Sequence, residues 1–481
     1  MAEPSSSKSH SFQAPKGTRD MYPADLLKRR FIEKMWRDTA IRHGFEEIDG
    51  PTFEHLELYT VKSGEGIVSE LFSFRREGGE KDYALRPEFT PTLARMYAAK
   101  AGGLPKPTKW FWQQNCFRAE KPQRGRLREF GQWNVDVIGG EGEPEAQARV
   151  DAEVISCAIA AFALLGLGPA DVQIRIGSRE LASAALLRAG VVPERLPEAL
   201  VLLDKADRMD PVVHQKACAD IGFDIIAYRG EAGKIEDGFD LRTSVVEQPV
   251  GSVQPDAYDF RGMSALRSEL HALGAAPWCR LDLSIARGLA YYTGMVFEVH
   301  EAGGKERAIA GGGRYDKLIE MFGGPPTPAV GFGMGDVVLS LVLEDRGLMP
   351  QGQALLDKLS EPPASLRPDV FVISNGQPES DAAVRPLVAR LRRGGHGGRG
   401  GRGEAGEPRS GENRVPPLHA RHSYKATKNI GKLLQEASAV HARFAAIIEN
   451  ASEATLKNLG SQEQEKVRVE DIGSRVASSL R

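Results

Sequence analysis

Polar side chains with the chemistry of a ligand site gather on two neighbouring stretches of the sequence. From Lys109 to Gly140 polar and apolar residues alternate at period two, which predicts two long strands joined by a polar loop near 121–125. Phe130, Gln132 and Asp136 fall on one face of the second strand. A ring can stack on a base there, while an amide and a carboxylate can hydrogen-bond a polar ligand. The pattern predicts either the floor of a binding site or a solvated hairpin face.

Basic and acidic residues flank the same hairpin. Arg118 ends the first strand and precedes the basic loop that contains Arg126. Guanidinium groups pair with phosphate oxygens in a bidentate fashion, so this end of the hairpin suits a phosphate chain. Glu88 and Asp136 are acids that suit an ammonium group or a basic side chain. Each residue alone is typical of an exposed ion pair, but together on one hairpin they favour a site.

Several further elements must position these residues. Apolar positions recur every three to four residues from Pro23 to Arg42, which predicts an amphipathic helix that stops at Gly44. A short strand is expected at 45–48. The Ala- and Leu-rich stretch 144–167 is predicted to be helical, and 178–232 continues with charged helical patterns, as an inserted helical module would. The helical module is followed by a strand-like stretch at 280–300, the glycines 311–313 and an apolar helix reaching Leu343.

The last third of the chain has a different organisation. Residues 349–366 are rich in Gln, Ser and Pro and are predicted to be a linker. Strands at 369–374, 419–424 and 444–449 alternate with predicted helices, which indicates an α/β domain. The low-complexity segment 394–417 cannot form a core. A neutral insertion is favoured there, because loop closure costs little free energy; a flexible basic loop that touches nucleic acid is the alternative.

Length and composition limit the class of protein. The chain has 481 residues, 41% hydrophobic and 27% charged, so two or three globular domains are expected. No run approaches 18 apolar residues, and the polar arm 1–14 has no apolar segment of the signal-peptide type, so neither a membrane span nor a signal peptide is expected. Four widely spaced cysteines match neither a disulfide framework nor a zinc site. A cytoplasmic protein is predicted.

The net charge of −2 conceals an asymmetry. Residues 367–481 contain 19 Lys and Arg against 13 Asp and Glu, which leaves 44 against 52 in the rest of the chain. A basic C-terminal domain on an acidic body indicates a polyanionic partner, although a chance fluctuation across solvated surfaces is an equal alternative at this point.

Five motifs resemble those of the histidyl-tRNA synthetases, a family of class II aminoacyl-tRNA synthetases. Residues 16–20 and the helix into Pro51 resemble the opening of the family and its dimer-forming motif 1, and 117–132 resembles motif 2. Residues 284–294 and 311–316 resemble the two histidine-specific motifs, which class II enzymes for other amino acids do not share. Residues 328–343 stand where motif 3 belongs.

The resemblance implies an α+β fold in which helices flank an antiparallel catalytic sheet, followed by a C-terminal α/β anticodon-binding domain. The implied organisation is a disordered arm at 1–14, a catalytic core at 15–345 with a helical insertion at about 178–260, a linker at 346–366, and the anticodon-binding domain at 367–481, which contains the glycine-rich insertion.

The resemblance also implies roles for individual residues. Arg118 and Arg287 match the arginines on the α-phosphate of ATP, where fixed positive charge stabilises the transition state. Residues of the histidine site are Glu88, Thr90, Gln132, Asp136, Tyr291 and Tyr292. Residues of the ATP site are Arg118, Glu120, Arg126 and Phe130. Two positions depart from the family pattern: Ala290 replaces an aspartate, and Val338 replaces the motif 3 arginine that contacts ATP, so Arg126 or another side chain must serve the γ-phosphate.

The implied activity is that of a histidine-tRNA ligase. It would use ATP with Mg²⁺, whose protein ligands the sequence does not identify, and would act on L-histidine and tRNA(His) as a homodimer. One alternative is the synthetase-like regulatory subunit of ATP phosphoribosyltransferase, which typically lacks the anticodon domain and the catalytic arginines. A general RNA-binding protein that uses the Gly/Arg tract at 397–403 is a weaker one.

Overall fold

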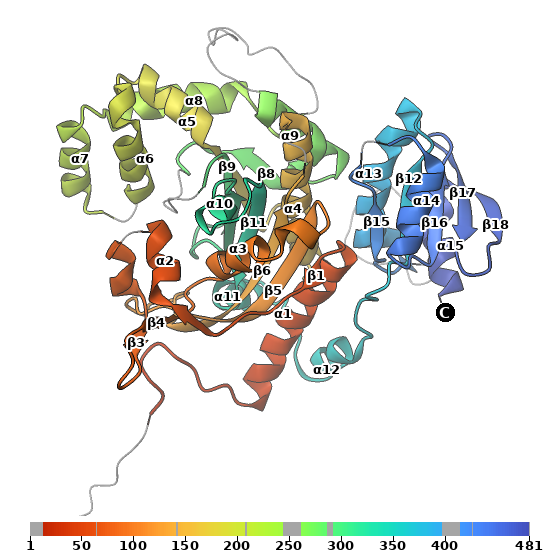
Figure 1. Ribbon diagram of the computed structural model, residues 1–481, viewed down its shortest axis with the longest axis horizontal. Helices are drawn as coiled ribbons and strands as arrows, with labels where there is room; N and C mark the ends of the chain where they lie inside the picture. The colour runs from red at the N-terminus through yellow and green to blue at the C-terminus, as the bar shows by residue number, and fades with distance from the viewer. Residues whose placement is uncertain are drawn as a thin grey trace, which may run out of the picture.

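A computed structural model describes residues 13–63, 65–140, 143–206, 209–243, 261–285, 292–396, 414–425 and 427–480. Figure 1 shows a large N-terminal unit built around a central sheet and a smaller C-terminal unit beside it. Within the described ranges, no helix is long and apolar enough to cross a membrane.

The central sheet has eight strands in the order β1-β5-β6-β11-β10-β9-β7-β8. All its pairs from β5 to β9 and from β9 to β7 are antiparallel, and only the two edge pairs are parallel. This sheet confirms the predicted antiparallel core. Its strands are β1 (Glu46–Glu47), β5 (Thr108–Phe117), β6 (Glu129–Ile138), β7 (Val172–Ser178), β8 (Cys279–Leu281), β9 (Met295–Glu301), β10 (Ala310–Arg314) and β11 (Ala329–Gly335).

Helices cover the apolar face of this sheet. The predicted first helix is confirmed as α1 (Pro23–Arg42), and it ends where Gly44 takes a positive φ of 77°, a conformation that glycine adopts without strain. Trp36 of α1 stacks on Trp133 of β6 with ring centroids 5.9 Å apart. The same core includes residues of α4 (Pro144–Leu164), α9 (Arg261–Ala272) and α11 (Asp336–Asp345).

The predicted helical stretch after residue 178 forms the connection between β7 and β8. It contains α5 (Arg179–Arg188), α6 (Leu196–Lys205), α7 (Pro211–Asp220) and α8 (Ile225–Gly238), which lie together at one end of the molecule in Figure 1. Residues 244–260 of the predicted insertion are outside the described ranges.

Smaller elements surround the other face of the central sheet. A three-stranded sheet in the order β2-β4-β3 lies next to α2. The elements are β2 (Phe53–His55), α2 (Leu56–Ser63), β3 (Ser73–Arg75), β4 (Asp82–Leu85), α3 (Thr90–Ala98) and α10 (Leu318–Met321).

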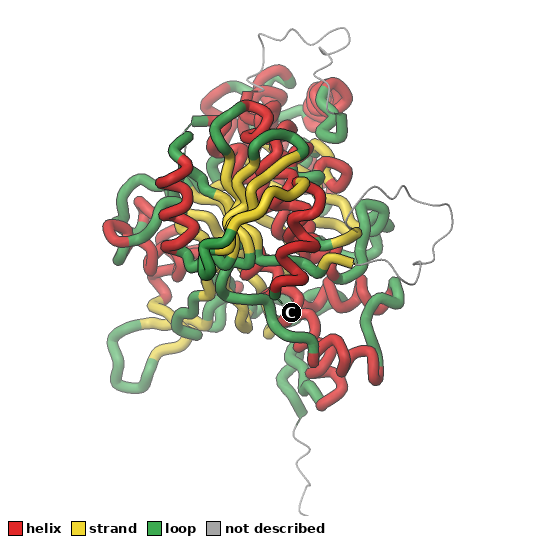
Figure 2. Tube along the Cα trace, turned by 90° about the vertical axis from the view of Figure 1, so that its right-hand side faces the viewer, coloured by secondary structure: helices red, strands yellow, loops and turns green. Residues whose placement is uncertain are grey.

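The C-terminal unit is an α/β sandwich, as predicted. Its sheet has the order β15-β12-β16-β17-β18, in which the first three strands are parallel. Helices α13 and α15 pack on one face and α14 on the other, and Figure 2 looks onto this unit. The elements are β12 (Val370–Ser374), α13 (Pro378–Arg393), β15 (Ala420–His422), α14 (Ile430–Ala439), β16 (Phe444–Ile448), β17 (Glu453–Asn458), β18 (Gln464–Arg468) and α15 (Ile472–Ser479). A short pair, β13 (Gly395–His396) and β14 (Arg414–Val415), flanks the glycine-rich segment.

The structure differs from the sequence prediction between the two units. The segment predicted as a linker contains helix α12 (Gly352–Ser360), whose Leu355 is buried in the main core. The chain that follows is fixed to α1, because the backbone amide of Ala364 donates to Asp38 at 2.9 Å. The polar composition of 349–366 concealed a helix that needs only one buried anchor.

A buried charged cluster joins the C-terminal unit to the central sheet. Glu153 of α4 accepts from Lys109 Nζ at 2.7 Å and from Arg392 Nη1 of α13 at 2.8 Å. Lys109 also donates to the hydroxyl of Tyr424 at 2.9 Å. Burial lowers the pKa of Lys109 to about 8, and the charge of Glu153 opposes that shift. Because a buried charge is tolerated only when it is paired, this cluster fixes the C-terminal unit at the start of β5.

Candidate active site

The hairpin of β5 and β6 carries the predicted polar face, but that face is not solvated. Phe130, Gln132, Asn134 and Asp136 alternate with Trp133, Val135 and Val137, which point into the core. The exposed fractions of Gln132, Asn134 and Asp136 are only 8%, 3% and 1%. The alternative of a solvated hairpin face is therefore wrong, and a row of polar side chains lies buried along the middle of the sheet.

Glycines of the neighbouring strand make room for these side chains. The register of β11 against β6 places Gly331 opposite Asp136 and Gly333 opposite Asn134. A Cβ atom at Gly331 would lie 2.0 Å from Asp136 Oδ1, and one at Gly333 would lie 2.2 Å from Gln132 Nε2. Any larger residue would collide with the polar row, so the glycines are required for it.

Strand β10, next to β11, also presents glycines on this face. Gly311 and Gly313 of β10 pair with Gly333 and Gly331, so they lie on the same face. The glycines at 311–313 thus belong to a central strand of the sheet. The polar row of β6 therefore lies beside two adjacent strands whose glycines present only backbone on this face.

Three consecutive residues of the polar row have unused acceptors. Gln132 Oε1, Asn134 Oδ1 and Asp136 Oδ2 are buried and have no hydrogen-bond partner among the residues that the structure describes. Each buried acceptor left without a donor costs about 1–3 kcal/mol. Three of them on one face indicate a site for a ligand that donates hydrogen bonds.

Asp136 is the most perturbed of the three side chains. Its Oδ1 accepts a hydrogen bond of 2.5 Å from the hydroxyl of Tyr315. Burial raises the pKa of Asp136 to about 7, the Tyr315 hydrogen bond opposes the shift, and the negative charge of Glu88 adds to it. The group therefore changes charge close to neutral pH, which is typical of functional sites.

A short segment that carries Glu88 and Thr90 is held against the hairpin. Arg86 donates to the carbonyl oxygens of Asn115 at 2.8 Å and Gly50 at 3.1 Å. Phe89 stacks on Trp112 with ring centroids 4.3 Å apart. Thr90 is buried at the start of α3, and Glu88 is half-buried and within electrostatic reach of Asp136.

The other predicted residues of this part divide into two groups. Tyr292 is buried in the same apolar cluster as Tyr315. Burial and Asp136 raise the pKa of Tyr315, and Tyr292 adds to that rise, so these two tyrosines lie near one another. Arg287 and Tyr291 lie outside the described ranges, and the structure places neither.

The loop end of the hairpin is cationic. Arg118 donates to the carbonyl oxygen of Pro87 at 3.1 Å, and its guanidinium carbon lies 5.1 Å from the centre of the Phe130 ring. Arg126 pairs with Glu120 at 2.7 Å. The structure thus brings these four predicted residues, Arg118, Glu120, Arg126 and Phe130, to the loop end of the polar row.

Sequence reasoning missed Tyr315 and Asn134 as members of the site. Asn134 lies between Gln132 and Asp136 on the polar face of β6, and Tyr315 belongs to the motif at 311–316. The signal for Tyr315 was its spacing, because period two places it on the face of Gly311 and Gly313.

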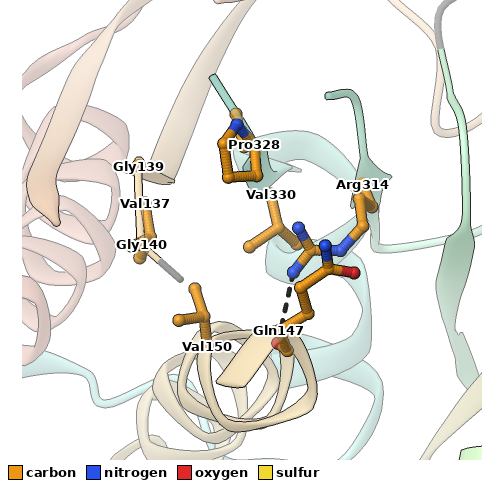
Figure 3. Close-up of a pocket in the computed structure, with 9 residues that line it drawn as sticks. Val137, Gly139, Gly140, Gln147, Val150, Arg314, Pro328 and Val330 are labelled. Atoms are coloured by element: carbon orange, nitrogen blue, oxygen red, sulfur yellow. Dashed lines mark hydrogen bonds between the residues drawn. The ribbon is translucent and has the colours of Figure 1, made fainter. Parts of the chain in front are cut away.

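Arg314, the neighbour of Tyr315, points to the opposite side of the sheet. It pairs with Asp151 at 2.5 Å and donates to the carbonyl oxygen of Gln147 at 3.2 Å. Figure 3 shows its guanidinium beside Gln147 in a small pocket that Val330 and Pro328 also line. Arg314 also pairs with Asp316 at 3.1 Å. Because Asp151 and Gln147 belong to α4, Arg314 joins β10 to that helix and lies away from the polar row.

A resident metal site is not apparent in the described part of the chain. No group of three or more His, Cys, Asp or Glu side chains there could hold a metal ion. The four cysteines are all buried and free.

Comparisons with known proteins agree with the motifs. The family profile described as "Histidyl-tRNA synthetase" matches residues 17–336. A histidine–tRNA ligase of Opitutus terrae is 40% identical over 346 residues, which cover 71% of this chain and 76% of that protein. The chloroplastic/mitochondrial histidine–tRNA ligase of Arabidopsis thaliana is 35% identical over 339 residues, 70% of this chain and 67% of the relative.

Solved structures support the fold. A histidyl-tRNA synthetase from Nostoc sp. PCC 7120 superposes with a TM-score of 0.56 at 22% identity, and the match covers 98% of this chain and 100% of that one. A Bacillus halodurans protein described as an ATP phosphoribosyltransferase regulatory subunit/histidyl-tRNA synthetase also gives 0.56, at 23% identity over 81% and 91% of the two chains. At these identities the structures show a shared architecture.

The close packing over the glycines of β11 predicts that an alanine substitution destabilises the protein at Gly331 but not at Gly335. In Gly331→Ala the new Cβ would also lie 2.7 Å from the Val135 carbonyl oxygen, so the backbone must shift, and we expect a loss of about 1–3 kcal/mol. Gly335→Ala, on the same face, meets nothing within 4 Å and serves as the control. Thermal unfolding should show a lower Tm for Gly331→Ala only; equal Tm values would contradict the close packing.

The raised pKa of Asp136 predicts a pH-dependent penalty. Between about pH 4 and pH 7 the folded protein holds a proton that the unfolded chain has lost, so this group lowers stability as the pH rises. Asp136→Asn keeps an oxygen acceptor for Tyr315 and removes the penalty. We expect its free energy of unfolding to exceed that of the wild type by an amount that grows from pH 4 to pH 7 and then levels off at roughly 4 kcal/mol or less, with a parallel rise in relative Tm. A difference independent of pH would contradict the shift.

Proposed function

The chain belongs to the histidyl-tRNA synthetase family, and on that premise we propose that it is a histidine–tRNA ligase whose active site lies along the polar row of β6 and the glycines of β10 and β11. The row of buried acceptors at Gln132, Asn134 and Asp136 is the observation that carries this proposal, because an imidazole and an ammonium group are hydrogen-bond donors.

The proposed reaction has two steps. In the first, a carboxylate oxygen of L-histidine attacks the α-phosphorus of ATP, the bond to the bridging oxygen of the β-phosphate breaks, and pyrophosphate leaves with histidyl-adenylate formed. In the second, a ribose hydroxyl at the 3′ end of tRNA(His) attacks the histidyl carbonyl carbon, and AMP leaves. Both steps need fixed positive charge at the phosphate and a precisely held amino acid.

The amino acid would lie over the glycines. We assign Glu88 and Thr90 to the α-amino group, since a carboxylate is the expected partner of an ammonium. Gln132 and Asp136 would bind the imidazole together with Tyr291 and Tyr292. A carboxyl that titrates near pH 7 matches the imidazole, whose ordinary pKa is about 6.5, so one proton can be shared between them.

ATP would lie at the loop end of the hairpin. Arg118 and Arg287 are assigned to the α-phosphate, and Phe130 to the face of the adenine ring. Arg126 and Glu120, which pair with each other, would contact the rest of the nucleotide. We propose that ATP enters as its Mg²⁺ complex, so the ion arrives with the substrate and needs no cluster of protein ligands.

The C-terminal unit, 367–481, is the proposed anticodon-binding domain, after a catalytic core at 15–345 and a connecting segment at 346–366. Its excess of Lys and Arg over Asp and Glu supports contacts to RNA phosphates. We also infer that the enzyme works in the cytoplasm. The alternative function, that of a regulatory subunit of ATP phosphoribosyltransferase, is not favoured by any residue of the described site.

A homodimer is also proposed, and an exposed aromatic cluster supports it. Phe53 and Phe74 are 49% and 44% exposed on the three-stranded sheet. Their ring centroids lie 5.8 Å apart, and each lies within 5.8 Å of the Tyr83 ring. Contiguous exposed aromatic surface of this kind is typical of a protein interface, and the motif 1 resemblance points to a second copy as the partner.

Histidine-dependent ATP–pyrophosphate exchange tests the activity. The wild type should exchange with histidine and not with other amino acids. Arg287→Ala should lower the rate about a hundredfold or more, because it removes charge at the α-phosphate, and leave histidine binding intact. Arg195→Ala, which removes an exposed ion pair with Glu198, is the control. Folded wild-type protein without histidine-dependent exchange would refute the proposed function.

The oligomeric state tests the aromatic cluster. The double variant Phe53→Ser, Phe74→Ser should shift the mass measured by light scattering from dimer toward monomer at micromolar concentration. Ile226 of α8 is an apolar side chain that is even more exposed, at 75%, and Ile226→Ser should leave the mass unchanged. A wild-type monomer, or an unchanged dimer in the double variant, would contradict the proposal.

A further inference from the structure

We propose that Arg307 binds the β- and γ-phosphates of ATP and the pyrophosphate that leaves. This residue lies before β10, outside the residues that the motifs identified, and the inference rests on the proposed function. The phosphates beyond the α-position need cationic partners, and the described site supplies Arg118 and Arg126 on one side only.

The backbone places the segment of Arg307 against the site. Ile309 donates its backbone N–H to Val299 O at 2.7 Å, and its carbonyl oxygen accepts from the amide of Gly335 at 3.3 Å. The segment 306–309 therefore runs along the ends of β9 and β11, next to the start of α11. Gly335 stands opposite Gln132, so this position borders the polar row.

The hairpin loop closes onto the same segment. Arg124, at the tip of the loop, donates to Glu306 at 2.8 Å. A Cβ atom built on Gly125 would lie 3.8 Å from Glu306 Oε2 and 3.2 Å from Val338 Cγ2. Glu306 is thus a positioning residue that ties the segment to the loop, and the next residue, Arg307, sits beside Arg126.

The charges around Arg307 leave it available for an anion. Its side chain is exposed and forms no hydrogen bond or ion pair with any residue that the structure describes. By contrast, Arg124 pairs with Glu306 and Arg126 with Glu120. The positive charges of Arg307 and Arg118 lower the pKa of Arg126 beyond the effect of burial. Three guanidinium groups held close together repel one another, and a polyanion between them removes that repulsion.

The uncharged Val338 explains why the positive charge of Arg307 is needed. The family pattern has an arginine at its position, but Val338 is buried in the core beneath Gly125 and carries no charge. Arg307 reaches the same loop from the neighbouring segment. The cation for the distal phosphates is therefore supplied from the β9–β10 connection instead of from α11.

Calorimetric binding of ATP and of AMP to the full chain tests this role without turnover. In the wild type ATP should bind more tightly than AMP. Arg307→Ala should weaken ATP binding about tenfold or more and leave AMP binding within twofold, and Arg307→Lys should restore part of the difference. Lys305→Ala, an exposed cation two residues away, controls for general electrostatics and should match the wild type.

Exchange kinetics provide a second readout. In Arg307→Ala the KM values for ATP and pyrophosphate should rise about tenfold, while the KM for histidine stays within twofold. Unchanged ATP binding in Arg307→Ala, or an equal loss of ATP and AMP, would overturn the assignment. Loss of ATP preference in Arg307→Ala, with no histidine-dependent exchange by the wild type, would refute the ligase function and uphold the phosphate site.

Discussion

Placing an amide and a carboxylate side by side within the middle of a sheet is the constraint on which this structure depends. Buried polar groups of β6 lose their contacts with water and need compensating partners. Gly331 and Gly333 give them space, since a Cβ at either position would collide with them. The hydroxyl of Tyr315 donates to one oxygen of Asp136, and the remaining acceptors of the polar row have no partner among the described residues. The acceptors of the polar row therefore remain available to a ligand, because the neighbouring strands carry no side chains that would pack against them.

The opposite face of the same strand provides the stability. Trp133, Val135 and Val137 pack against α1 and α4, so alternate residues of β6 serve a core and a site. The hairpin is also held at both ends. Lys109 is fixed by Glu153 and by the C-terminal unit at one end. At the other end the backbone amide of Arg128 donates to the carbonyl oxygen of Gly17 at 2.7 Å. A strand fixed in this way can present side chains with little freedom, as catalysis requires.

Local patterns predicted the elements whose signal is local. Helix α1, the hairpin and the alternating elements of the C-terminal unit follow from periodicity and from turn residues. The glycine-rich strands β10 and β11 were not predicted from these patterns. Such strands lack the β-branched residues that are typical of strands, and their partner strands are remote in the sequence. Strands β17 and β18 were missed because their charged residues resemble loop. Arg307 reaches the site through tertiary contacts, which spacing within one segment cannot reveal.

Histidine binding to the variant Gly333→Ala tests the central claim most directly. Its new Cβ meets the flexible end of Gln132 at 2.2 Å, so Gln132 must turn away while the fold survives. Calorimetry should show histidine affinity reduced at least tenfold in Gly333→Ala at a wild-type Tm, and unchanged affinity in Gly335→Ala. Wild-type histidine affinity in Gly333→Ala would show that the amino acid does not lie over the glycines beside Gln132.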